Sequence, residues 1–144
     1  MNADELNEMG PVDYVLVEWP GRQPSGEALP YLVDLVDRGL IRIIDLAFIA
    51  KGEDGSVAMV EIADLGDEIA VFEGASSGLL HEDDIAQAGD VLEPGTSAAL
   101  LVYENTWAGP FAGAVRRSGG QLVASGRIPA DDFLAALDAA EATA

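Results

Sequence analysis

The sequence predicts an α+β domain in which one strand–helix–strand unit occurs twice, over residues 12–63 and 97–128. In each copy an apolar strand ends at a glutamate, and a tryptophan follows close behind. Proline and glycine then bracket a stretch with helical patterning, and a second apolar run comes after it. A further observation is the pair Asp54-Gly55 between two apolar runs, which favours a β-hairpin turn. These patterns together indicate one sheet with helices packed on it.

The first unit begins with a strand over residues 12–19, whose nearly continuous apolar character predicts burial on both faces. A helix is expected to begin near Glu27, because Pro30 fits only the first turn of a helix. Gly39 is placed to end this helix in a left-handed conformation. Residues 40–51 then form a long strand that completes the unit.

The hairpin turn at residues 53–55 leads to an antiparallel strand over residues 57–62. Residues 64–93 are the least repeat-like part of the chain. Apolar side chains recur there at helical spacing on either side of a small-residue linker, residues 74–78. We therefore expect a helical insertion between the two units.

The second unit begins with a buried strand over residues 98–104. Thr106 is expected to cap the helix that follows, and Gly119 to end it. Residues 121–127 should form the closing strand. Residues 130–141, rich in alanine, then form a C-terminal helix.

The simplest architecture for this order is a ferredoxin-like, split βαβ sandwich built from a duplicated βαβ unit with a helical insertion. Residues 1–10 form a flexible, acidic tail, and residues 11–144 form one domain. Strands joined by crossover helices should run parallel within the sheet, and the hairpin adds antiparallel pairing. The middle helices, the C-terminal helix or a second subunit must cover the remaining sheet face.

Composition narrows the classes of function. The chain of 144 residues has 26 acidic residues against seven Lys and Arg, a formal net charge of −19, and no cysteine. Such a charge excludes a basic footprint for nucleic acid and disfavours anionic membrane surfaces. No apolar run reaches the length of a membrane span, and the acidic start is unlike a secretory signal. We therefore expect a cytoplasmic protein, for which a basic protein partner or a cationic small molecule is possible.

The best candidate for a site is the repeated pairing of a glutamate with a tryptophan at a strand end. If both strand ends meet at one sheet edge, two carboxylates beside two indoles would bind a cationic or polar ligand, or divide acid and base roles. The alternative is structural: the indoles cap the core and the carboxylates pair with arginine. The candidate ligand-binding residues are Glu18, Trp19, Glu104 and Trp107, with Arg22 and Arg127 as neutralising partners.

Other motifs are weak. His81 precedes three acidic residues, but no second histidine or cysteine supports a metal site, so a solvated helix start is the better interpretation. Phosphate-binding glycine loops and a nucleophile elbow are absent from the sequence. Ser76 and Ser77 have no base nearby except that histidine. We predict no catalytic residues, no cofactor and no metal.

The remaining clue is the C-terminal helix, where Phe133, Leu134 and Leu137 lie among many alanines. Such a face can pack within the chain or against a second subunit. We predict a non-enzymatic, homo-oligomeric protein, and the alternative is a ligand-binding protein or enzyme that uses the paired glutamates and tryptophans.

Three segments carry a resemblance to a known family: residues 15–21 (VLVEWPG), 92–100 (LEPGTSAAL) and 125–129 (SGRIP). The chain resembles a family of bacterial domains of unknown function over nearly its whole length after Met9. That family is similar to a broader group described as predicted membrane proteins, whose middle is Gly-rich and apolar. Here the middle holds many acidic residues, so the membrane description does not carry over. The resemblance implies the fold and no activity.

Overall fold

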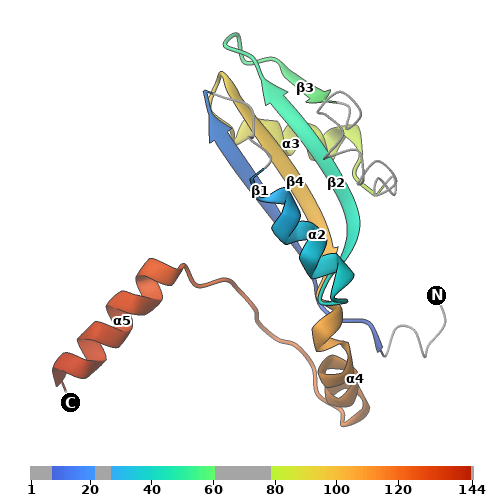
Figure 1. Ribbon diagram of the computed structural model, residues 1–144, viewed down its shortest axis with the longest axis vertical. Coiled ribbons are helices and arrows are strands. Elements are labelled where there is room, and N and C mark those ends of the chain that lie inside the picture. Colours follow the sequence, from blue (N-terminus) through green and yellow to red (C-terminus); the bar gives the residue numbers. More distant parts are fainter. Residues whose placement is uncertain (1–7, 22–26, 61–78, 144) are drawn as a thin grey trace.

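A computed structural model describes residues 8–21, 27–60 and 79–143. Its centre is a four-stranded sheet in the order β1-β4-β2-β3, in which every neighbouring pair is antiparallel (Figure 1). A mixed α/β fold is thereby confirmed, whereas the ferredoxin-like assignment stays a prediction. The elements are β1 (Val12–Pro20), α2 (Leu29–Asp37), β2 (Arg42–Lys51), β3 (Val57–Val60), α3 (Glu82–Asp90), β4 (Thr96–Glu104), the 3₁₀ helix η3 (Thr106–Ala108), α4 (Gly109–Arg117) and α5 (Ala130–Thr143).

The crossover from β1 through α2 to β2 is split. Both strands pair antiparallel with β4, so they run parallel to each other with β4 between them. The crossover from β3 to β4 is split in the same way, by β2. The expected parallel direction of the first two strands is therefore present, but they are not neighbours.

Helices cover both faces of the sheet, α2 in front and α3 behind in Figure 1. On the α2 face, Leu46 and Phe48 of β2 pack against Leu32 and Val33 of the helix. On the other face, Ile49 belongs to a cluster with Ile85 of α3 and with Leu92, Ala98 and Leu100. The side chains of β2 alternate between these two cores because successive residues of a strand point to opposite faces. The middle of the chain thus supplies the second cover.

The prediction that β1 is buried on both faces is wrong. Its residues are exposed or half-buried, because β1 lies at one edge of the sheet with β4 on its inner side. The strand that is buried on both faces is β2, over Asp45 to Ile49, since it lies inside the sheet between the two helix layers. Apolar sequence alone did not separate an edge strand from a central one.

Two glycine predictions are confirmed by backbone geometry. Gly39 follows α2 with φ 71°, and Gly119 follows α4 with φ 87°, both in the left-handed region. Thr106 does not cap a helix as predicted. It is instead the first residue of η3, and its hydroxyl donates to the carbonyl of Gly39 at 2.8 Å. This bond links η3 to the turn that follows α2.

The predicted closing strand over residues 121–127 is wrong in this structure. Residues 120–129 form neither helix nor strand, because no described strand lies beside them to complete a ladder. They run as an extended segment from α4, at the lower end of the sheet, to α5, which lies apart from the sheet (Figure 1). We call residues 120–143, the extended segment with α5, the C-terminal arm.

Candidate functional site

The structure does not bring the two predicted glutamates together. The register of β1 on β4 places Glu104 opposite Val12, whereas Glu18 is opposite Ala98. The six residue steps from Val12 to Glu18 span about 20 Å at about 3.3 Å each. The prediction assumed that both strands end at the same sheet edge. Because β1 and β4 are antiparallel, their carboxyl ends lie at opposite ends of the sheet, and no joint pocket forms.

Glu104 lies in a buried cluster of its own and is 5% exposed. Its Oε1 accepts from Nε of Arg42 at 2.8 Å, and its Oε2 accepts from the backbone N–H of Gly10 at 2.9 Å. Both carboxylate oxygens are therefore satisfied, as a buried charge requires. A Cβ at position 10 would overlap the carbonyl of Asn105, so only glycine allows this approach. The cluster ties the N-terminal segment to the start of β2.

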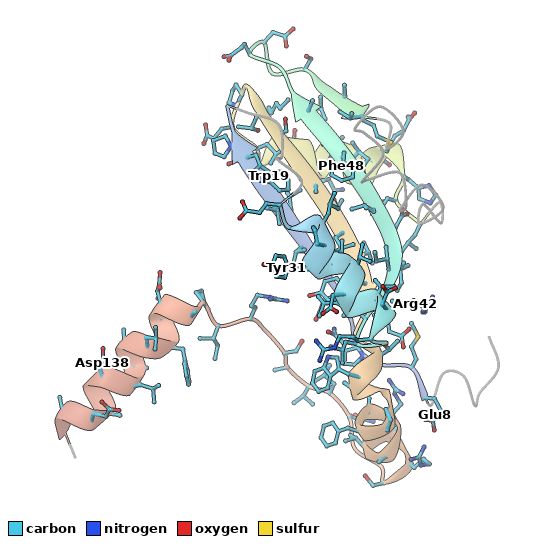
Figure 2. All side chains as sticks on the ribbon, viewed as in Figure 1. Glu8, Trp19, Tyr31, Arg42, Phe48 and Asp138 are labelled. Atoms are coloured by element: carbon cyan, nitrogen blue, oxygen red, sulfur yellow. The ribbon has the colours of Figure 1, made fainter. Side chains whose placement is uncertain are left out.

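The other glutamate, Glu18, is half-buried and accepts from the backbone N–H of Glu93 at 2.9 Å. The neighbouring Trp19 points to the opposite face, because side chains alternate along a strand. Figure 2 shows Trp19 at the upper end of the sheet and Arg42, the partner of Glu104, at the lower end. The glutamate and tryptophan of this pair thus do not share one face.

Trp107 belongs to η3, where its exposed indole N–H donates to Oδ1 of Asn105 at 3.4 Å. Arg127 belongs to the C-terminal arm and donates to the hydroxyl of Tyr103 at 2.8 Å, so it neutralises neither glutamate here. The position of Arg22 lies outside the described residues.

His81 stands at the start of α3, as the solvated-terminus interpretation predicted. Its backbone N–H donates to Oδ2 of Asp84 at 2.9 Å, which is half of a capping box. Across residues 8–21, 27–60 and 79–143, no three histidine or acidic side chains are grouped so that they could hold a metal ion.

Asp45 is a buried carboxylate that sequence reasoning missed. It is 2% exposed, Oδ1 accepts from the backbone N–H of Leu46, and Oδ2 accepts from that of Leu80 at 3.0 Å. The ladder between β2 and β4 shifts register beside it, between Ile43 and Asp45. Its bond to Leu80 fixes the approach to α3. An aspartate within an otherwise apolar run was the available signal.

The described residues form a groove between the β1 edge and α3, with a volume of about 510 Å³. We call it the β1–α3 groove. It is mostly apolar, and the carboxylate on it belongs to Asp84. The side chain of Asp13 lies on the face of its register partner Tyr103 and accepts from Nδ2 of Asn105 at 2.9 Å. Its lining residues are Val12, Asp13, Tyr14, Leu16, Leu80, Asp84, Gln87, Ala88, Val91, Leu100 and Val102.

The second unusual feature is the C-terminal arm, whose large apolar side chains are all exposed. Val123 is 92% exposed, and the other five side chains have smaller exposed fractions. Groups of exposed large apolar side chains mark interaction surfaces. The apolar residues of the arm are Leu122, Val123, Ile128, Phe133, Leu134 and Leu137.

The described part of the chain is an α/β domain whose sheet is covered on both faces. It has an open groove at the β1 edge and an exposed apolar arm. The chain belongs to the Family of unknown function (DUF6325), which matches residues 8–143. This confirms the resemblance to an uncharacterised domain family. No curated protein and no solved structure matches the chain. In the described part of the chain, every helix is too short or too polar to cross a bilayer.

Proposed function

We propose that this protein is a non-enzymatic, self-associating module that acts in the cytoplasm. The observation that carries the proposal is the C-terminal arm. Its extended segment and α5 expose six large apolar side chains, and none of the six belongs to either core of the described residues. Exposed apolar patches mark sites where a protein meets another protein, a membrane or a ligand, and we assign this one to a second copy of the chain.

The net charge of the chain opposes association, so the proposal requires apolar contact to drive it. The chain carries a net charge of −19, so association must bring like-charged molecules together. Apolar contact opposes that repulsion. Homo-oligomers of closed cyclic symmetry are the commonest result of self-association, and a twofold dimer is the simplest.

The test is the mass of the full chain in solution across a wide range of protein concentration. Sedimentation velocity should give a species of at least twice 15.0 kDa that dissociates on dilution. A mass of 15.0 kDa at every concentration would reject self-association.

A second candidate function is binding of a small ligand, which the β1–α3 groove favours. A volume of about 510 Å³ with mostly apolar walls lies within the range of ligand sites. The carboxylate of Asp84 would suit an amphipathic cation. The alternative in which Glu18 and Glu104 share a ligand has no support from their placement. Isothermal titration calorimetry with apolar amines would test the groove, because neither tryptophan lines it.

A further inference from the structure

We propose that two copies of this chain exchange their C-terminal arms. In this dimer the apolar face of α5 from one copy docks in the β1–α3 groove of the other, and residues 120–129 lead it there along the edge of β1. The inference rests on the proposed self-association and names its interface.

The first step is the form of the occupant. α5 is a helix of 14 residues, about 21 Å long. Phe133, Leu134 and Leu137 lie within one stripe at helical spacing, and Asp131 and Asp138 border it, three and four residues from Leu134. An isolated helix of this length is marginal in water and takes its stability from docking the apolar face. α5 therefore requires an apolar surface to pack on.

The second step is the form of the acceptor. The β1–α3 groove has an apolar floor formed by Leu16, Leu100 and Val102. Its rim includes Tyr14, 74% exposed, and Val91, 73% exposed, two large side chains that the described part of the chain leaves open to water. An open groove between a strand edge and a helix suits an amphipathic helix, which is a recurring mode of protein recognition.

The third step explains why α5 occupies the groove of a second copy rather than the groove of its own chain. Tyr103 points to the α2 face of β4, because its neighbours Val102 and Glu104 belong to the α3 face. The bond from Arg127 to the Tyr103 hydroxyl therefore holds the arm on the α2 face, and the groove lies on the other. Docking within one chain would require the arm to break this bond and turn around the edge of β1.

The fourth step is reach and size. The ten residues 120–129 span up to about 33 Å when extended, enough to carry α5 clear of its own sheet. Exchange about a twofold axis makes the contact twice, and each copy contributes both an arm and a groove. Interfaces of standard size draw about 20–30 residues from each partner, which residues 120–143 with the groove lining supply.

The experiment uses the full chain and four single substitutions that each add one negative charge. Leu134→Glu places it on the apolar face of α5, and Val91→Glu places it on the groove rim. The matched controls are Ala139→Glu on the far side of α5 and Ala86→Glu at an exposed position of α3 that does not line the groove. Circular dichroism verifies that each variant keeps its fold.

Arm exchange predicts that Leu134→Glu and Val91→Glu each raise the dimer dissociation constant by at least about tenfold, because each breaks two symmetric contacts. The two controls should change it much less. A wild-type dimer that neither substitution weakens would overturn arm exchange while self-association stands. A wild-type monomer at every concentration would overturn both proposals.

A cross-link separates exchange from docking within one chain. The chain has no cysteine, so the double variant Val91→Cys, Leu134→Cys carries only the two introduced thiols. Under oxidation, arm exchange predicts a disulfide-linked dimer on a non-reducing gel. A monomer closed by an internal disulfide would show that α5 occupies its own groove and would overturn the proposal. A native dimer that forms neither disulfide would also overturn it and leave the groove to another ligand.

Discussion

The sheet and the C-terminal arm use the same kinds of residue with opposite results. In the sheet, Ile49 and Phe48 on successive positions of β2 are buried in separate cores under α3 and α2. In the arm, Leu122 and Val123 on successive positions are both exposed. Figure 2 shows Phe48 on the sheet and Asp138 on α5, clear of it. The difference indicates that the apolar side chains of the arm are suited to packing on a surface that its own sheet does not provide in this structure.

Composition sets the arm apart from an ordinary disordered tail. Disordered segments have low hydrophobicity and few large apolar residues. The arm instead combines six large apolar residues with a helix of 14 residues. A segment of this kind is expected to fold against a partner, and its effect on the stability of the isolated sheet should be small. The following predictions test that separation.

The largest effect is expected from a substitution in the core beneath α3. Ile49 is 1% exposed, so Ile49→Ala leaves a cavity and should lower the free energy of unfolding by about 2–5 kcal/mol. The matched substitution Leu137→Ala in the arm should change it by less than about 0.5 kcal/mol at low protein concentration. Urea denaturation of both variants, followed by circular dichroism, measures the two changes. Equal losses would mean that the arm is part of the core of a single chain.

The second prediction concerns the two glutamates that the sequence presented as equivalent. Glu104→Gln puts an amide where a buried carboxylate accepts from Arg42 and Gly10, and should lower the free energy of unfolding by about 1–3 kcal/mol. Arg42 is 55% exposed on its side chain, so water limits the loss. Glu18→Gln keeps an acceptor for the Glu93 N–H and should cost less than about 1 kcal/mol.

Thermal unfolding of both variants beside the wild type decides this comparison. Neither substitution should alter the dissociation constant of the dimer, because both residues belong to the sheet and neither lines the groove. If the two variants lose the same stability, the buried cluster around Glu104 has no special role.

Local conformation was predictable from sequence to a large extent. Strand β1, helix α2 with its terminal glycine, the hairpin turn and strand β4 all lie where the sequence placed them, with bounds differing by at most two residues. These features depend on turn chemistry and on the period of apolar residues, which are local properties. The helix over residues 130–141 was also predicted and extends to Thr143.

Pairing between distant segments was not predictable in the same way. Two similar strand–helix units suggested that β1 and β4 run in the same direction, but the register of Val12 on Glu104 shows the opposite. That single reversal moved Glu18 and Glu104 to opposite ends and removed the predicted site. Residues 121–127 have the composition of a strand, yet a strand needs a neighbour, and a sequence does not say whether that neighbour belongs to the same chain.

The third prediction uses salt to test which forces would hold the proposed dimer together. Each copy has a net charge of −19, so charge repulsion opposes association and is screened as ionic strength rises. Apolar arm–groove contacts are not weakened by salt. The dimer dissociation constant should therefore fall several-fold between low and high salt, measured by sedimentation equilibrium. A rise in the dissociation constant with salt would mean that ion pairs dominate the interface.

The smallest effect is expected in the hairpin turn, far from both the arm and the groove. The hydroxyl and the backbone N–H of Ser56 donate to Oδ1 of Asp54 at 2.7 and 3.0 Å, and together they hold the pKa of that carboxyl below its ordinary value of 3.8. Because the pKa is lowered in the folded state, its contribution to stability is complete above pH 3.8 and is lost as pH falls through the lower folded value.

Ser56→Ala removes the larger of the two causes and should raise the pKa of Asp54 toward 3.8, which an NMR titration of the carboxyl carbon measures. The side chain is fully exposed, so the change in stability should be slight and self-association should not respond. An unchanged pKa in this variant would show that the backbone N–H alone sets the titration of the turn.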